Sequence, residues 1–131
     1  MPLEPDVKEL LERPNFAAFT TYLPDGMPST HVMWVGADDG HLVINTETGR
    51  QKYRNVQRDP RVCVTIVDRE NPYHYAEVRG RVVETVAGDD ARENIDELSR
   101  KYKGSDYPDA AITTERVILR IEPDRQRVWG K

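Results

Sequence analysis

The stretch His41-Leu-Val-Ile-Asn-Thr46, followed by Thr48-Gly-Arg-Gln-Lys-Tyr-Arg-Asn-Val56, contains an apolar strand, a glycine turn and the first turns of a helix. Four cations follow the turn with no acid among them: Arg50, Lys52, Arg54 and Arg58. The whole chain has a net charge of −4, so overall composition does not explain this cluster. Free backbone N–H groups and the positive end of the helix dipole attract anions, and Arg and Lys add full charges. The segment is therefore a candidate phosphate site.

A solvated helix face is the other interpretation of the same four charges. Arg50, Arg54 and Arg58 follow i, i+4 spacing on a helix, so they repel one another unless an anion lies between them. The strand and glycine turn directly before the helix favour the phosphate site.

Outward from this stretch, short alternating segments separated by Gly, Pro and Asp predict a chain of strands. Turns are expected at Pro24-Asp-Gly26 and Gly36-Ala-Asp-Asp-Gly40, and Gly80 marks a bend or bulge. Asp59-Pro60 ends the basic helix, since proline excludes helix from the residue before it. The predicted strands cover residues 15–22, 27–35, 41–46, 61–67, 73–86 and 116–122, with 125–129 after a turn at Pro123-Asp124.

Two further helices are predicted. The first is N-terminal and ends near Pro14, with apolar residues at Leu3, Val7, Leu10 and Leu11. The second follows Asp89-Asp90 as its N-cap, with apolar positions at Ala91, Ile95, Leu98 and Tyr102. Hairpin connections with few inserted helices predict a mainly β fold, as a closed or split antiparallel barrel rather than a parallel sheet.

The length, composition and charge of the chain predict its domain count, its location and the partners that it lacks. A length of 131 residues predicts one domain spanning 1–131, and small domains of this type often add a subunit interface. No apolar run approaches the roughly 20 residues of a membrane helix, and no signal peptide is evident. With a single cysteine, Cys63, this predicts a cytoplasmic protein without a membrane partner. The net acidic charge argues against nucleic acid as a partner.

The ordered set of motifs resembles the FMN- and F420-binding split β-barrels of the pyridoxamine 5′-phosphate oxidase-like superfamily, and most of all its short F420-dependent branch. The likeness covers nearly the whole chain, and the order of the motifs is more specific than any one of them. The motifs are Phe16-Ala-Ala-Phe-Thr-Thr21, Asp25-Gly-Met-Pro28, Leu42-Val-Ile-Asn-Thr46, Gly49-Arg-Gln-Lys-Tyr-Arg-Asn-Val56, Arg58-Asp-Pro-Arg-Val62 and Tyr75-Ala-Glu-Val-Arg-Gly80 with Arg81-Val-Val83.

This resemblance implies a homodimer with coenzyme F420 or FMN bound at two sites on the interface. The three histidines of the chain show no metal-ligand spacing, so no metal site is predicted. We expect Trp34, which alternates with Met33, to lie outside the ring pocket. The residues implied to bind the cofactor are Thr30, His31, Val32 and Met33 for the ring, Thr46 and Asn55 for the side chain, and Gly49, Arg50 and Lys52 for the phosphate.

The implied function is an F420- or FMN-dependent oxidoreductase that moves a hydride between the bound ring and a small organic substrate. The sequence has no nucleophile elbow and no Walker-type phosphate loop, which fits an enzyme whose cofactor carries the chemistry. Two alternatives stay open at this point. One is an FMN-dependent oxidase acting on a vitamin B6-like substrate. The other is a flavin- or haem-binding module without turnover, in which His31 or His74 would bind a haem.

Overall fold

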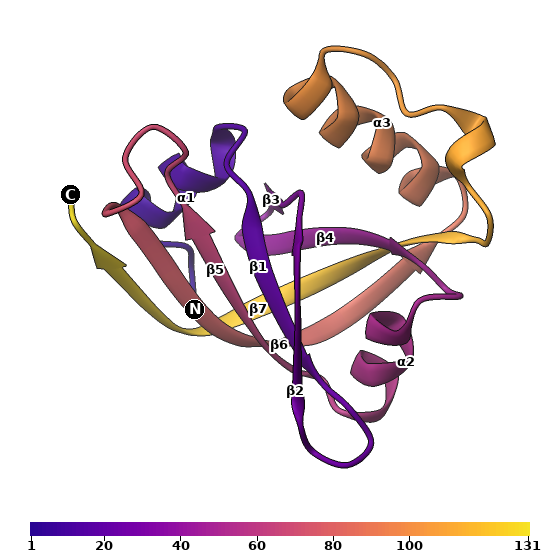
Figure 1. Ribbon diagram of the computed structural model, residues 1–131, viewed down its shortest axis with the longest axis horizontal. Helices are drawn as coiled ribbons and strands as arrows, with labels where there is room; N and C mark the ends of the chain where they lie inside the picture. Colours follow the sequence, from indigo (N-terminus) through magenta and orange to yellow (C-terminus); the bar gives the residue numbers. More distant parts are fainter.

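The computed structural model describes all 131 residues and shows one seven-stranded antiparallel sheet with three α-helices and a short 3-10 helix (Figure 1). The mainly β, antiparallel fold expected from the hairpin pattern is thereby confirmed. The sheet order is β2-β1-β5-β6-β7-β4-β3. The elements are α1 (Pro5–Glu12), β1 (Ala17–Tyr22), β2 (Pro28–Met33), β3 (Gly36–Asp38), β4 (His41–Glu47), α2 (Gln51–Arg58), β5 (Arg61–Val67), β6 (Tyr75–Ala87), α3 (Asp89–Lys103), η1 (Asp109–Ala111) and β7 (Arg116–Trp129).

The two longest strands, β6 and β7, pair along almost their whole length. The predicted turn at Pro123-Asp124 is wrong, because both residues lie inside β7. The strand tolerates a proline there because the ladder shifts register between Arg79 and Gly80, so that Gly80 pairs with Pro123. Gly80 is required at this point, since a Cβ atom would collide with the Glu122 carbonyl oxygen. The bend or bulge predicted at Gly80 is therefore confirmed, in the form of a bulge.

The segment predicted as one turn at residues 36–40 is instead a hairpin. Gly36–Asp38 forms the edge strand β3, which pairs with β4 from Gly36 opposite Val43 to Asp38 opposite His41. Only Asp39 and Gly40 form the turn, with φ angles of 49° and 82°. Two successive residues with positive φ suit a two-residue hairpin turn, because its twist matches that of the flanking strands.

The N-cap of helix α3 lies one residue before the predicted one. Gly88, with a φ of 77°, occupies the N-cap position, and Asp89 and Asp90 lie in the first turn without a capping hydrogen bond. The two carboxylates still favour this end of the helix through its dipole. At the other end Gly104 adopts the left-handed conformation and ends the helix. Helix α3 is the longest helix, with 15 residues, and its sequence is polar. No helix of the chain is long and apolar enough to cross a membrane.

The core has a main cluster and a smaller one. The main cluster joins the inner face of the sheet to α1 and α2, and includes the predicted helix residues Val7, Leu10 and Leu11. The smaller cluster, Val43, Ala91 and Ile118, packs α3 against the other face of β4 and β7. Strand β7 is thus buried on both faces, because Val117, Leu119 and Ile121 belong to the main cluster. Helices α2 and α3 therefore belong to the clusters on opposite faces of β4, α2 through Val56 of the main cluster and α3 through Ala91 of the smaller one.

Candidate functional site

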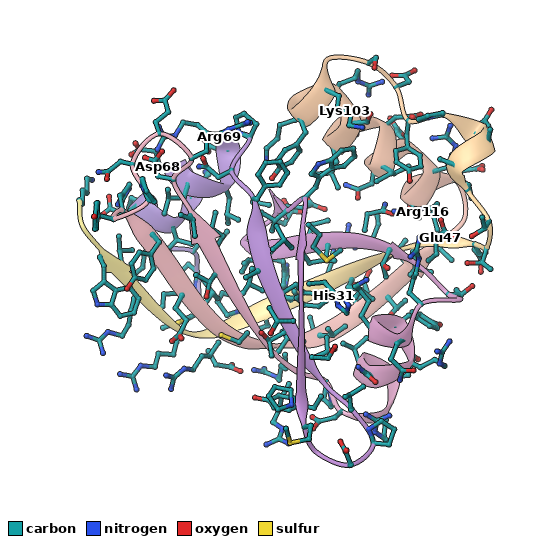
Figure 2. All side chains as sticks on the ribbon, in the orientation of Figure 1. His31, Glu47, Asp68, Arg69, Lys103 and Arg116 are labelled. Carbon is teal, nitrogen blue, oxygen red and sulfur yellow. The ribbon has the colours of Figure 1, made fainter.

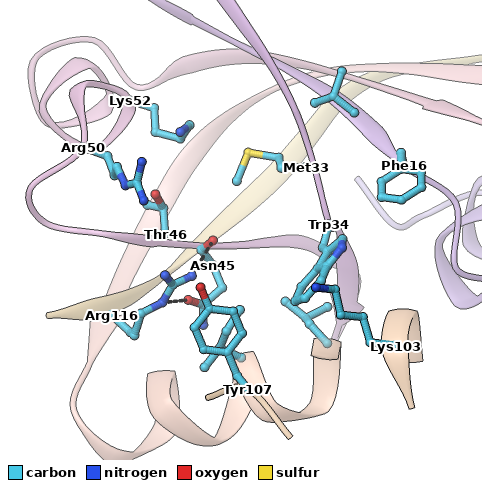
Figure 3. Close-up of a pocket in the computed structure, with 13 residues that line it drawn as sticks. Phe16, Met33, Trp34, Asn45, Thr46, Arg50, Lys52, Lys103, Tyr107 and Arg116 are labelled. Atoms are coloured by element: carbon cyan, nitrogen blue, oxygen red, sulfur yellow. Dashed lines mark hydrogen bonds between the residues drawn. The ribbon is translucent and has the colours of Figure 1, made fainter. Parts of the chain in front are cut away.

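A groove of about 430 Å³ lies between α2, the end of β2, strand β4 and helix α3 (Figure 3). Four of its lining residues carry a positive charge and none carries a negative charge. A ligand that fills it is therefore expected to be anionic. The lining residues are Phe16, Val32, Met33, Trp34, Asn45, Thr46, Arg50, Lys52, Ile95, Leu98, Lys103, Tyr107 and Arg116.

Arg50 and Lys52 meet at the α2 side of this groove, next to Thr46 (Figure 3). Arg50 is the N-cap residue of α2, and the backbone N–H groups of Gln51 and Lys52 have no acceptor within the protein. Burial lowers the pKa of Lys52, and the charges of Arg50 and Arg116 lower it further. Neither Arg50 nor Lys52 has an ion-pair partner in the chain, so an anion bound here would relieve the repulsion between them.

The other two cations of the basic segment have partners within the protein. The Arg54 guanidinium donates to the Gly49 carbonyl oxygen at 3.1 Å and to Gln51 Oε1 at 3.0 Å. The Arg58 guanidinium donates to the Tyr22 carbonyl oxygen. Neither residue lines the groove. The segment is therefore divided into two cations that face the groove and two that stabilise the local fold.

The strand expected to face a ring contributes only part of its predicted set. Val32 and Met33 line the groove, as does Thr46 from β4. Thr30 instead shares a hydrogen bond of 2.7 Å with the hydroxyl of Thr20, and His31 is exposed on β2.

Two further predicted residues lie outside the groove lining. Asn55 is fully buried, and its amide donates to Thr21 Oγ1 at 2.9 Å while its carbonyl oxygen accepts from Gln51 at 2.7 Å. It therefore joins α2 to β1. The Gly49 N–H donates to Thr114 Oγ1 at 3.1 Å, which fixes the turn before Arg50.

A buried ion pair that the sequence interpretation missed lies beside the groove, between Glu47 and Arg116 (Figure 2). Glu47 is 1% exposed and accepts five hydrogen bonds, from the backbone and hydroxyls of Thr113 and Thr114 and from Arg116 at 3.0 Å. Burial alone would raise the pKa of Glu47, but these donors outweigh it and lower the pKa to about 2. Glu47 is therefore ionised and neutralises Arg116 at the groove wall.

The same carboxylate is linked to the phosphate segment. Thr114 Oγ1 donates to Glu47 at 2.9 Å and accepts from the Gly49 N–H at 3.1 Å. Glu47 thus fixes, through one hydroxyl, the residue that precedes Arg50. Asn45 joins the arrangement, because its Oδ1 accepts from Arg116 Nε at 2.9 Å and its amide donates to the Ala91 carbonyl of α3. No sequence signal pointed to this cluster, since Glu47 and Arg116 are 69 residues apart.

The side of the groove formed by α3 is aromatic. Trp34, which was expected to lie outside the ring pocket, lines this side of the groove. Its ring stacks on Tyr102 with centroids 5.3 Å apart and meets Tyr107 edge-on at 6.2 Å. The Lys103 ammonium lies 5.8 Å from the Trp34 ring centroid. The periodicity of α3 did place Ile95 and Leu98 on its apolar face, but it did not show that this face borders a groove.

Residues 3–130 match the family described as pyridoxamine 5′-phosphate oxidase. Among solved structures, one named F420 reductase is 36% identical, with a TM-score of 0.82, over 92% of this chain and 94% of that chain. A conserved hypothetical protein from Mycobacterium tuberculosis is 25% identical with a TM-score of 0.79, over 98% of this chain and 85% of that chain.

A third structure shares the fold at lower identity. It is a Listeria innocua protein named as a candidate pyridoxamine 5′-phosphate oxidase, 23% identical with a TM-score of 0.66, over 92% of each chain. No protein with a curated description matches this chain.

Proposed function

The chain belongs to the pyridoxamine 5′-phosphate oxidase family, and on this premise we propose that it is an oxidoreductase that uses coenzyme F420, or alternatively FMN. It would transfer a hydride between the bound ring and a small organic substrate. The observation that carries the proposal is the unpaired couple of Arg50 and Lys52 facing a groove without acidic residues. The similarity to an F420 reductase supports F420 as the first choice.

The residues of the groove fit a phosphate-bearing, ring-containing cofactor. Arg50 offers a forked pair of donors and Lys52 a compact charge, beside the free N–H groups of α2. Met33 and Val32 from β2 offer apolar surface for a flat ring, and Thr46 offers a hydroxyl. When bound, the cofactor ring supplies the hydride chemistry, and this chain binds it, orients it and limits the access of water.

We propose further that two copies of the chain form a homodimeric split barrel with the groove at their interface. In one chain Val32 is 72% exposed and Phe16 is 42% exposed, although both line the groove. A second copy placed over β2 would cover these apolar side chains and close the open side of the groove. Such cover also removes water from the ring, which strengthens electrostatic contacts within the site.

An FMN-dependent oxidase is the second candidate. The family match supports it, and both FMN and F420 carry a phosphate that Arg50 and Lys52 could bind. A haem-binding module has less support from the site. His31 is exposed on β2, and His74 Nδ1 lies 3.0 Å from the Trp129 carbonyl oxygen, so neither histidine lines the groove.

The test is a titration of the purified protein and its variants with F420 and with FMN. Hydrogen bonds to charged groups contribute about 1.5–3 kcal/mol each. Because 1.4 kcal/mol is tenfold in affinity, Arg50→Ala is expected to weaken cofactor binding about ten- to a hundredfold. The melting temperature of the cofactor-free protein should hardly change, since Arg50 is exposed and unpaired.

Arg58→Ala on the same helix is the matched control, because its guanidinium contacts Tyr22 and does not reach the groove. It should leave both affinities unchanged. Equal and small losses for Arg50→Ala, Arg58→Ala and Arg54→Ala would show a diffuse basic face and contradict the proposal, as would a protein that binds neither cofactor.

A further inference from the structure

The last turn of α3 carries three cations, and only one of them lacks an ion pair or hydrogen bond. Arg100 pairs with Asp106 at 2.6 Å. Lys101 Nζ donates to the carbonyl oxygens of Leu11 and Val35. Lys103 makes no ion pair or hydrogen bond in the chain, and it is exposed at the groove. The fold therefore uses two of the three charges and leaves the third available to a ligand.

The available charge lies over a fixed aromatic surface. Tyr102 stacks on the Trp34 ring at an interplanar angle of 9°, and Tyr107 meets it at 88°. Tyr107 is itself held, because its N–H donates to Asp96 at 2.9 Å and its carbonyl oxygen accepts from Arg92 at 3.0 Å. By contrast, a single exposed cation–π contact holds Lys103, and such contacts are weak. A flat ligand can therefore displace the ammonium from the ring and then pair with it.

The cations that line the groove come from elements on two sides of it. Arg50 and Lys52 come from α2, whereas Lys103 comes from α3 on the other side of the groove (Figure 3). Arg116 lies between these elements and is neutralised by Glu47. A cofactor phosphate on Arg50 and Lys52 leaves Lys103 with no role in holding that phosphate.

We propose that Trp34 and Lys103 form a substrate subsite for a flat aromatic or conjugated carboxylate. The conjugated system stacks on Trp34 and the carboxylate pairs with Lys103 Nζ. That this molecule is a substrate depends on the proposed function, whereas its binding to Trp34 and Lys103 does not. Carboxylates of the same chemistry also occur on the side chain of F420 but not on FMN, so the test must separate these two sources.

The experiment is calorimetric titration with trans-cinnamate and with trans-cinnamamide, which has nearly the same shape but no charge. It is carried out on the cofactor-free protein and on the F420-saturated and FMN-saturated protein. The wild type should bind the acid about tenfold more tightly than the amide, the range expected for one charge-assisted hydrogen bond. Lys103→Gln should weaken cinnamate about tenfold and leave cinnamamide unchanged. Trp34→Leu should weaken both probes.

Lys8→Gln is the matched control, since Lys8 is an exposed, unpaired lysine on α1 that does not line the groove. It should retain the preference for the acid. Equal binding of acid and amide in the wild type, or an unchanged preference in Lys103→Gln, would overturn the subsite. A loss of F420 affinity in Lys103→Gln with FMN affinity retained would also overturn it, because Lys103 would then serve the cofactor. A Lys103-dependent preference in a protein that binds neither cofactor would support the subsite and contradict the proposed function.

Discussion

At the scale of single residues, Glu47 neutralises one of the four cations that line the groove. It is buried, it accepts five hydrogen bonds, and it neutralises Arg116 while fixing Thr114 against Gly49. A buried carboxylate without these donors would be strongly destabilising. With them it becomes a rigid support for the turn that presents Arg50.

This role predicts a change in cofactor affinity opposite to the one expected from charge alone. Glu47→Gln removes a negative charge beside the groove, which by charge alone should tighten binding of an anionic cofactor. Because an amide cannot accept all five hydrogen bonds, we expect the turn before Arg50 to loosen and cofactor affinity to fall about tenfold. Titration with F420 and FMN at a temperature where the variant is folded measures this. Unchanged or tighter binding would show that Glu47 supports only the fold.

The same residue predicts an acid dependence of stability. The pKa of Glu47 falls from 4.5 to about 2 in the folded chain, so its stabilisation is complete above pH 4.5 and is lost as the pH falls toward 2. A shift of this size corresponds to about 3 kcal/mol in the free energy of unfolding. Denaturant unfolding between pH 5 and pH 2.5 should show a flatter pH dependence for Glu47→Gln than for the wild type. Parallel curves would contradict this assignment.

At the scale of elements, the bulge between β6 and β7 depends on one glycine. In Gly80→Ala the new methyl group meets the Glu122 backbone carbonyl, which cannot move without breaking the ladder. We expect a loss of about 2–3 kcal/mol in the free energy of unfolding, as for other overpacked sites. Gly36→Ala is the comparison, since its methyl group would lie 3.2 Å from the flexible Leu98 Cδ2 and should destabilise much less. Equal denaturation midpoints for the two variants would show that the contact with the Glu122 carbonyl does not cause the loss of stability in Gly80→Ala.

Strand β7 is the element on which the sheet depends most. It lies between β6 and β4, and it contributes Val117, Leu119 and Ile121 to the main core. Truncation after Thr114 removes these side chains and separates β4 and β3 from the other strands. We expect insoluble or unfolded protein, measured by solubility and circular dichroism. A soluble truncated chain with a cooperative melt would contradict this expectation.

At the scale of the whole molecule, the open groove predicts a homodimer. The apolar side chains of Val32 and Phe16 are exposed at the groove in which we propose that the cofactor binds. A stable dimer of this kind is expected to bury on the order of 2,000 Å² in total. Light scattering at micromolar concentration should give twice the chain mass of 15.1 kDa. A mass near that of one chain would contradict the proposal.

Val32→Asp gives a sharper test of the same idea. An aspartate on this exposed strand should weaken self-association and cofactor binding together, because in the proposed dimer one surface serves both. Sedimentation combined with FMN or F420 titration measures the two effects. A monomeric variant with unchanged cofactor affinity would show that the site does not need a second copy.

Local patterns in the sequence were enough to predict the antiparallel fold, the bulge at Gly80 and the position of the basic helix. Strand alternation, turn residues and the proline after Asp59 act over a few residues, so each can be interpreted without knowing where the chain goes next. They misassigned Pro123 and Asp124 for the same reason. Whether a proline breaks a strand depends on the partner strand, and here the register shift opposite Gly80 accommodates it.

Only the tertiary structure decided which residues share the groove. Arg50 and Arg58 look alike in the sequence, yet one faces the groove and the other contacts the Tyr22 carbonyl. Trp34 and Lys103 come together because α3 packs on β4 and β7 through Ala91, Val43 and Ile118. Contacts between residues so far apart depend on sheet order and helix packing, which no local period encodes. The kinds of side chain were therefore set by sequence, whereas their arrangement into a site was set by long-range packing.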